Sequence, residues 1–486
     1  MHTAPSEPWG SDLELWPRAG ALIGPHTTGV QMVDDLYKRL RSREVLHRSW
    51  AAVKQSGLAS PSETTVTAIR RYDETWLSNL EQIGKRLRGN TFRFDGEEGL
   101  TIPKGKGKGL RPVVMAPIAN RIVRRAILEV LQGYGCDSSR KTWHGVPAVR
   151  QIMETRTSVG GIKDRGVPHG LSLIDEAVRS GKTSFVRSDI KNFFTRIPLP
   201  EVNAFIAEAV ADRAFADIFK AALTTNLTNR AQLEERKHFK LFPDDDVGVA
   251  QGSALSALAA NIALRSFDKR MNDRGIVCVR YIDDFIMLGA SPAKVRAAYV
   301  AAREHLALMG MDVYDRTDDA ARHAGKFDEG NIYSGTDVLG YKVSETSRQP
   351  SAAAIQAFRK KCDVIVEQAK KQMSLAASGQ SPPNGQGYHQ AMVMLHKTVR
   401  GWSQAFRHTT ATQVFQSLDR EIDRRIEDMR AFALTLTQGA TAQSRRRVMG
   451  IQLLGETPSH PLPIIPAQQR HIPERDDDLG DMAPAA

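Results

Sequence analysis

Two adjacent aspartates, Asp283 and Asp284, stand between two apolar runs in the segment Val279-Arg-Tyr-Ile-Asp-Asp-Phe-Ile-Met-Leu. The flanking residues favour two short strands, which would place both carboxylates at the tip of a hairpin. Neighbouring carboxylates repel each other, but a hard divalent cation such as Mg²⁺ prefers oxygen ligands and would neutralise them. The pair therefore indicates a metal site, although a solvated turn between two strands has the same pattern.

A third carboxylate, Asp189, ends the apolar segment 184–189 and is followed by Phe193 and Phe194. An aspartate at the end of a strand is commonly only the cap of the next turn. Combined with the pair, Asp189 could complete a three-carboxylate cage for two Mg²⁺ ions. Two such ions, about 3.5–4 Å apart, activate an attacking hydroxyl and stabilise a leaving pyrophosphate.

Two glycine-containing motifs suit a phosphorylated ligand. Gln251 and Gly252 precede a run of small residues, and a turn there would let amide groups approach a ligand closely. Close packing of a helix on a sheet would use the same small residues. The glycine-interleaved basic run from Lys104 to Arg111 suits triphosphate contacts, although a run of charges is usually a solvated face.

The elements that would position these motifs alternate between helix and strand. Periodic apolar residues predict helices before residue 90 and at 120–131, 200–211, 253–271 and 294–309. Apolar β-type runs predict strands at 99–103, 112–115, 184–189 and 337–343, and a hairpin at 278–288. From about residue 351 the pattern is helical, interrupted by a loop at 377–387.

Composition sets wide limits on the class of protein. The chain has 486 residues, 41% hydrophobic and 25% charged, which is ordinary for globular proteins of more than one domain. No apolar run reaches the roughly 20 residues of a membrane span, and the N-terminus lacks a secretory pattern. The widely separated Cys136, Cys278 and Cys362 favour neither a zinc site nor a disulfide framework, so we expect a cytoplasmic protein. A formal charge of +12 favours nucleic acid as the partner.

The motifs occur in a characteristic order: a basic loop with Arg-Pro, Asp-x-x-x-x-Phe, Gln-Gly-x-x-x-Ser, Tyr-x-Asp-Asp and Val-Leu-Gly-Tyr. That order and spacing resemble the successive sequence blocks of the reverse-transcriptase family over residues 42–430. The resemblance implies an α+β, right-hand polymerase with fingers, a palm built on an antiparallel sheet of split βαβ type, and a helical thumb. It also implies an RNA-directed DNA polymerase that uses an RNA template, a DNA primer and dNTPs.

Roles for single residues follow from the resemblance. The implied catalytic residues and metal ligands, for Mg²⁺ with Mn²⁺ as an alternative, are Asp189, Asp283, Asp284 and the backbone carbonyl of Ile190. The implied nucleotide-binding residues are Lys104, Arg111, Phe194, Gln251 and Gly252, with the Phe194 ring placed to exclude a ribose 2′-hydroxyl. The implied primer and template contacts are Tyr281, Leu339, Gly340 and Tyr341.

The chain looks most similar to the prokaryotic group of this family, which includes group II intron proteins, retrons and defence-associated enzymes. The segments 102–104 and 111–112 resemble that group's fingers, and 400–419 resembles the maturase, or thumb, segment. Ile282, Ala250, Ala257 and Asn120 depart from the group II pattern, and no Cys/His-rich nuclease domain follows the thumb. These departures favour an antiviral defence enzyme of the abortive-infection or "unknown group" type, acting with a cognate noncoding RNA.

The expected organisation is an N-terminal extension (1–30), fingers (31–180), palm (181–345), maturase-like thumb (346–457) and a disordered, proline-rich acidic tail (458–486). Three alternatives stay open: a maturase-like RNA-binding protein, an RNA-dependent RNA polymerase, and an untemplated or protein-primed DNA polymerase. A homo-oligomer or a companion protein also stays open. No membrane partner is expected.

Overall fold

The computed structural model describes residues 35–104, 109–134, 143–273, 275–380 and 387–456. The chain divides into two compact units, Met1–Ser347 and Arg348–Ala486, which are described separately. The expected extension, the expected tail and Cys136 lie outside the described residues. No helix in the described ranges is long and apolar enough to cross a membrane.

Four helices open the first unit: α1 (Leu36–Leu40), α2 (Arg43–Leu58), α3 (Glu63–Glu74) and α4 (Trp76–Arg88). The hydroxyls of Ser42 and Ser62 accept hydrogen bonds from backbone N–H groups in the first turns of α2 and α3, as N-caps do. The apolar side of α2 packs against α5 (Ile118–Gln132). The helices predicted before residue 90 are therefore confirmed between residues 36 and 88.

Between α4 and α5, strands β1 (Glu98–Pro103) and β2 (Leu110–Met115) form an antiparallel hairpin. Ile102 pairs with Arg111 in this register. The helices α6 (Pro147–Glu154) and α7 (Val167–Arg179) follow α5 and lead into the main sheet.

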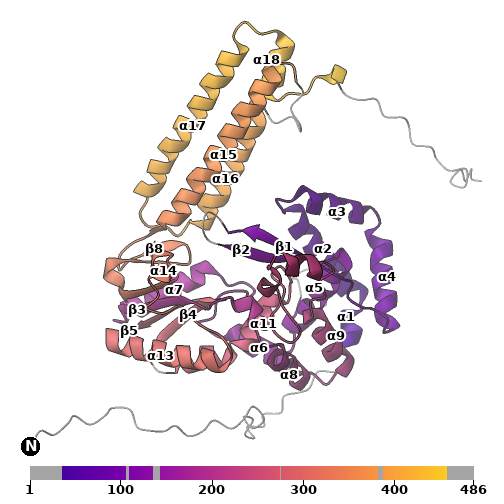
Figure 1. The fold of residues 1–486 in the computed structure, drawn as a ribbon, viewed down its shortest axis with the longest axis vertical. Coiled ribbons are helices and arrows are strands. Elements are labelled where there is room, and N and C mark those ends of the chain that lie inside the picture. Colours follow the sequence, from indigo (N-terminus) through magenta and orange to yellow (C-terminus); the bar gives the residue numbers. More distant parts are fainter. Residues whose placement is uncertain (1–34, 105–108, 135–142, 274, 381–386, 457–486) are drawn as a thin grey trace, which may run out of the picture. The chain divides into compact units, whose positions relative to one another are not determined.

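The main sheet has the strand order β4-β5-β3-β6, with every neighbouring pair antiparallel. Its strands are β3 (Ser184–Asp189), β4 (Val277–Tyr281), β5 (Asp284–Gly289) and β6 (Phe327–Asn331). All six residues of β3, the central strand, are buried. Figure 1 shows α7 on one face of this sheet and α13 (Pro292–Leu308) on the other.

The other helices of the unit are α8 (Leu199–Ala209), α9 (Arg213–Leu223), α10 (Arg230–Glu235), α11 (Ser256–Ala263), α12 (Arg265–Asn272) and α14 (Asp319–His323). The predicted single helix at 253–271 is wrong in detail. Its residues form α11 and α12, because Leu264 has a ψ of 8°, outside the helical range.

The predicted strand at 337–343 is also wrong in detail, because it is a hairpin of β7 (Thr336–Val338) and β8 (Tyr341–Val343). Leu339 and Gly340 have φ values of 53° and 83°. Two successive residues with positive φ form the two-residue turn that matches the twist of a hairpin.

The second unit begins with β9 (Arg348–Pro350) and then contains α15 (Ala352–Ala377), α16 (Tyr388–Ala405), α17 (Gln413–Thr437) and α18 (Ala442–Met449). Its apolar core includes Cys362, Val366, Met373 and Leu395. The Trp402 ring lies 4.5 Å from that of Phe358, centroid to centroid, so it packs against this core.

Candidate active site

Two of the predicted carboxylates lie opposite each other on neighbouring strands. Asp189 ends β3 and is the register partner of Asp284, the first residue of β5. Residues paired in this way have Cα atoms about 4.5–5.5 Å apart. The main sheet therefore brings together two residues that are 95 positions apart in the chain.

The third carboxylate lies in the turn between β4 and β5. Ile282 has a φ of 60°, a left-handed conformation that β-branched residues rarely adopt. The backbone carbonyl of Asp283 accepts a hydrogen bond of 2.9 Å from the Ile190 N–H. The turn is thus held directly against the end of β3, where Asp189 lies.

The electrostatics of the site disfavour three ionised carboxylates. Desolvation and the charge of Asp189 raise the pKa of Asp284 to about 7. Desolvation and Asp189 also raise the pKa of Asp283, opposed by the Lys326 and Lys104 ammonium groups. A positive charge placed among these side chains would therefore stabilise their ionised forms.

The side chains present fit a divalent cation. The Oδ1 atom of Asp284 is buried and accepts no hydrogen bond, and Arg187 Nη1 is 4.0 Å away. A buried carboxylate oxygen without a donor is the ligand that a metal such as Mg²⁺ takes. Across the described ranges no three His, Cys, Asp or Glu side chains already form a metal-binding group, and Asp189 pairs with the Lys326 ammonium group.

A buried polar network supports the turn from below. The Arg280 side chain is fully buried and donates to both carboxylate oxygens of Asp268, at 2.7 and 2.6 Å. It also donates to the Ile282 carbonyl at 2.9 Å. Ser158 Oγ and Asn261 Oδ1 accept further bonds from the same guanidinium group, at 2.8 and 2.9 Å. Arg280 is therefore a positioning residue for the aspartate turn.

The predicted nucleotide-binding residues come from the β1–β2 hairpin and two loops. The N–H of Val114 in β2 donates to the Gln251 carbonyl at 3.2 Å. Gly252 has a φ of 106°, which favours glycine, and a Cβ atom there would come no closer than 3.8 Å to Val114 O. The hydroxyl of Ser256 donates a hydrogen bond of 2.6 Å to the carbonyl of Ala250, which further fixes the backbone directly before Gln251.

The side chains of Phe193 and Phe194 differ in how far they are buried. Phe193 is 2% exposed and belongs to the core, whereas Phe194 is half-buried. The Phe194 carbonyl accepts a hydrogen bond of 2.7 Å from the Val249 N–H, which joins its loop to the residues before Gln251. Lys104 and Arg111 are exposed, on and beside the two-stranded hairpin.

The expected primer and template residues differ in exposure. Tyr281 is 36% exposed, and Gly340 is exposed at the β7–β8 turn. Tyr341 is only 1% exposed, so its side chain belongs to the packing of the hairpin rather than to an open surface. Of the expected residues on this hairpin, Leu339 is half-buried and Gly340 is exposed.

The residues that the sequence motifs did not single out are Arg280, Asp268, Arg187 and Lys326. A signal was present for Arg280, since an arginine inside the apolar strand Val277–Tyr281 needs a buried partner. For Lys326, 137 positions from the Asp189 that it contacts, the sequence contains no such signal.

The α+β architecture, with carboxylates on adjacent strands of an antiparallel sheet, defines a right-hand polymerase. Residues 102–316 match the sequence model of the family described as reverse transcriptase (RNA-dependent DNA polymerase). This matched part, 215 of the 486 residues, is similar to a reverse transcriptase domain. It contains Asp189, Asp283 and Asp284.

Individual proteins similar to the chain are distant. An "Uncharacterized 91 kDa protein in cob intron" of Schizosaccharomyces pombe is 25% identical over 190 residues, 39% of this chain and 20% of that protein. Among solved structures, a partial Cas6-RT-Cas1–Cas2 complex has a TM-score of 0.30 and 18% identity, covering 53% of this chain and 38% of the other. Telomerase from Candida albicans, in complex with a fragment of telomeric RNA, has a TM-score of 0.35 and 10% identity. That similarity covers 78% of this chain and 70% of the telomerase chain. The chain thus spans about a fifth of the length of the curated relative.

Proposed function

We propose that the protein is a reverse transcriptase that adds dNTPs to the 3′ end of a primer along an RNA template. The observation that carries this proposal is the pairing of Asp189 with Asp284 at the end of the central strand, beside Asp283 in the turn. The buried Asp284 Oδ1 atom supports it, because it accepts no hydrogen bond and is free to coordinate a cation. The match of residues 102–316 to the reverse-transcriptase family supports the choice of reaction.

Asp189, Asp283, Asp284 and the Ile190 carbonyl would hold the metal ions. Divalent cations bound there, Mg²⁺ or Mn²⁺, would activate the primer 3′-hydroxyl and neutralise charge on the leaving pyrophosphate. The contribution of the chain itself is geometric. The sheet register holds Asp189 opposite Asp284, and Arg280 holds the turn that carries Asp283.

The nucleotide would be bound by groups from both sides of the site. Lys104 and Arg111 carry the charges that suit a triphosphate, Arg as a fork and Lys as a point charge. The Ile102–Arg111 pairing keeps Arg111 on a strand rather than on a loop. Gln251 and Gly252 would shape the pocket, and the Phe194 ring would exclude a 2′-hydroxyl. Tyr281 and the Leu339–Gly340 turn would contact primer and template.

We assign residues 31–180 to the fingers, 181–345 to the palm and 346–457 to the thumb. The palm assignment is supported by the main sheet, and the thumb assignment by the helical unit that begins at Arg348. The biological setting that we propose is prokaryotic antiviral defence in the cytoplasm, with a cognate noncoding RNA and dNTPs as partners. Support for it comes from the departures from the group II pattern at Ala250, Ala257 and Ile282.

A second candidate is a group II intron-like maturase, a protein that binds intron RNA. The favouring observation is the similarity to a protein in the cob intron of S. pombe, over 39% of this chain. The two candidates share the reverse transcriptase domain and differ in the RNA that is bound.

The test is primer extension by the full-length protein, freed of copurified nucleic acid, with Mg²⁺, an RNA template, a DNA primer and labelled dNTPs. Asp283→Asn and Asp284→Asn keep side-chain shape, and Asp217→Asn, at an exposed position on α9, is the matched control. We expect template-dependent extension by the wild type and the control, reduced by about two orders of magnitude or more in the two site variants.

Each other result selects another function. Extension with ribonucleotides would identify an RNA polymerase, and extension that ignores the template would identify an untemplated or protein-primed enzyme. Absence of extension by the wild type, together with tight binding of one RNA, would favour the maturase.

A further inference from the structure

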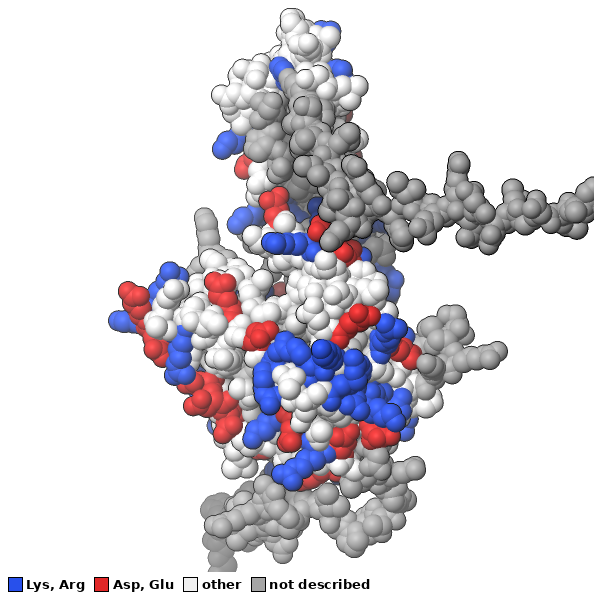
Figure 2. Space-filling view, turned by 90° about the vertical axis from the view of Figure 1, so that its right-hand side faces the viewer, with Lys and Arg blue, Asp and Glu red and all other residues white. Residues whose placement is uncertain are grey.

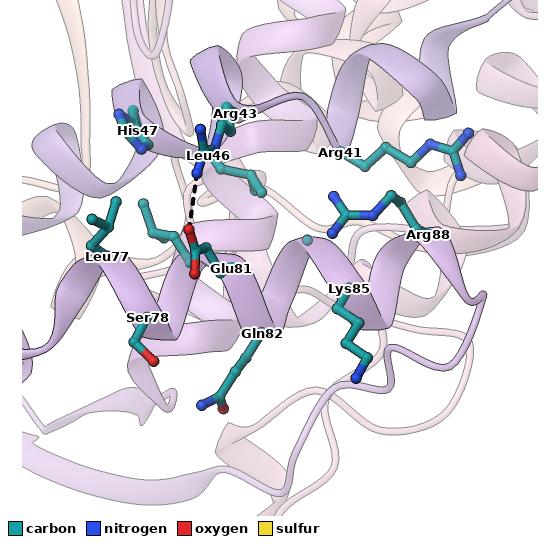
Figure 3. Close-up of a pocket in the computed structure, with 12 residues that line it drawn as sticks. Arg41, Arg43, Leu46, His47, Leu77, Ser78, Glu81, Gln82, Lys85 and Arg88 are labelled. Atoms are coloured by element: carbon teal, nitrogen blue, oxygen red, sulfur yellow. Dashed lines mark hydrogen bonds and ion pairs between the residues drawn. The ribbon is translucent and has the colours of Figure 1, made fainter.

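A cavity of about 480 Å³ lies between α2 and α4, among the N-terminal helices and apart from the residues of the candidate active site. Figure 3 shows the side chains that line it. Leu77 of α4 and His47 of α2 lie at one end, and Arg88 of α4 lies at the other. The volume falls in the range of about 300–1,000 Å³ that is usual for small-ligand sites. It is large enough to receive one nucleotide unit of a nucleic acid strand.

The floor of this cavity is apolar. Leu46 of α2 and Leu80 of α4 are 2% and 3% exposed. Gly84, one turn further along α4, also lines the floor, where α4 comes close to α2. A Cβ atom there would lie 3.6 Å from Leu46 Cδ1 and 3.3 Å from Arg88 Nη1. The face of a nucleobase, which is flat and weakly polar, suits such a floor.

The rim of the cavity is basic. Arg41, Arg43, Lys85 and Arg88 line it, against the single carboxylate of Glu81. Glu81 is engaged by Arg43 at 2.9 Å, and both side chains are exposed. In the described part of the chain, Arg41, Lys85 and Arg88 have no carboxylate partner. Three cations therefore remain for an anionic ligand.

The charge extends beyond the rim. Residues 35–90 contain eleven Lys and Arg against six Asp and Glu, a net charge of +5. Figure 2 shows Lys and Arg gathered on one face of the first unit. A basic surface of this kind suits the repeated phosphates of a polynucleotide.

We propose that this cavity, lined by α2 and α4, binds single-stranded RNA outside the polymerase site. One unpaired base would rest on the floor of Leu46, Leu80 and Gly84, and the flanking phosphates would lie on Arg41, Lys85 and Arg88. The proposal rests on the proposed function, in which RNA is the template. We commit to RNA rather than DNA because the proposed reaction uses RNA as its template strand.

The test measures binding of a labelled, unstructured RNA by fluorescence anisotropy at several salt concentrations. An excess of unlabelled primer–template duplex occupies the polymerase site, and dNTPs are omitted. The labelled RNA therefore does not report binding at that site. The variants are Arg41→Gln with Arg88→Gln to remove charge, and Gly84→Met to fill the floor. Arg70→Gln with Arg71→Gln, two exposed residues of α3 away from the cavity, removes the same charge.

We expect the Arg41 and Arg88 double variant to bind RNA about tenfold more weakly. The slope of log K against log salt concentration should become shallower by about 1.4, which is about 0.7 for each lost phosphate contact. Gly84→Met should weaken RNA binding and reduce the salt dependence by no more than about 0.7, since the added side chain also displaces Arg88. The α3 control should bind within about twofold of the wild type. DNA of the same sequence should bind more weakly than RNA.

Equal affinities of the Arg41 and Arg88 variant and the α3 control would overturn the site. Equal binding of RNA and DNA, with Gly84→Met unaffected, would overturn the base pocket and leave a general polyanion surface. Gly84→Ala, which fills less space and favours a helix, is the second variant if Gly84→Met fails to fold. Loss of primer extension with this RNA binding intact would contradict the proposed function and not the site.

Discussion

Arg280 and Asp268 form a doubly hydrogen-bonded ion pair in the core, directly behind the turn that carries Asp283 and Asp284. The exposed fractions of the two side chains are 0% and 3%. The same guanidinium group donates to the carbonyl of Ile282, the residue with left-handed backbone. The position of the carboxylates at the surface of the site therefore depends on a charge pair inside the protein.

The first prediction concerns this pair. Asp268→Asn should reduce the free energy of unfolding by about 3–5 kcal/mol, because it leaves the Arg280 charge buried without its counterion. Replacing both partners, Arg280→Met with Asp268→Leu, should restore most of the stability but not primer extension, since nothing then holds the Ile282 carbonyl. Urea unfolding and extension kinetics measure the two effects. Full activity in the double variant would contradict the positioning role of Arg280.

The second prediction concerns Gly160, which contacts the back of the same turn. A Cβ atom at Gly160 would lie 2.5 Å from Ile282 N and 2.9 Å from Tyr281 Cα. Because both neighbours are backbone atoms, Gly160→Ala should displace the turn and lower extension by about tenfold or more. The matched control is Gly330→Ala in β6, where the nearest atom would be 3.6 Å away. Similar activities of the two variants would show that the turn tolerates displacement.

The third prediction concerns the aspartates when no metal is bound. Asp284→Asn should raise the free energy of unfolding by about 1 kcal/mol in EDTA, because it removes a desolvated charge that faces Asp189. Added Mg²⁺ should raise the melting temperature of the wild type by mass action, and much less that of the variant. Thermal denaturation with and without Mg²⁺ measures both effects. A metal response of the variant equal to that of the wild type would place the cation elsewhere.

The fourth prediction concerns the half-buried Phe194. If its ring lies under the sugar, Phe194→Ala should raise the incorporation of ribonucleotides relative to deoxynucleotides by about 10–200-fold, the range for a group of this kind in a pocket. Phe193→Leu, at the 2% exposed neighbour, should reduce stability and leave this ratio unchanged. The readout is kcat/KM for each nucleotide. An unchanged ratio in Phe194→Ala would assign both rings to packing.

The fifth prediction concerns the helical unit. Arg359 donates to both carboxylate oxygens of Glu421, at 2.8 and 2.5 Å, and these hydrogen bonds lower the pKa of Glu421. Because the pKa of Glu421 is lower in the folded than in the unfolded protein, the ion pair stabilises the folded state at pH values above the unfolded pKa. This stabilisation is lost as the pH falls through the folded pKa. Glu421→Gln should therefore cost about 1 kcal/mol near pH 7 and progressively less below pH 4. Asp419→Asn, an exposed neighbour on α17, is the control for thermal melts at the two pH values.

The sequence alone determined the features that depend on neighbouring residues. The alternation around Asp283 and Asp284 predicts a hairpin with an acidic tip, and the structure has β4 and β5 with the pair at their junction. The order of the motifs along the chain, through its resemblance to the reverse-transcriptase family, predicted the class of polymerase. The hairpin at Leu339 was missed because leucine seldom adopts the φ of 53° that its turn requires.

Only the tertiary structure decided which distant residues meet. Arg280 reaches Ser158 across 122 positions, and Lys326 reaches Asp189 across 137. The cavity between α2 and α4 forms where Gly84 comes close to Leu46, and the pattern of neither helix shows that approach. Local residue types determine strands, turns and caps, whereas a charge pair or a cavity depends on how whole elements pack. The candidate metal-binding aspartates could thus be proposed from the sequence, but the groups that hold them in place could not.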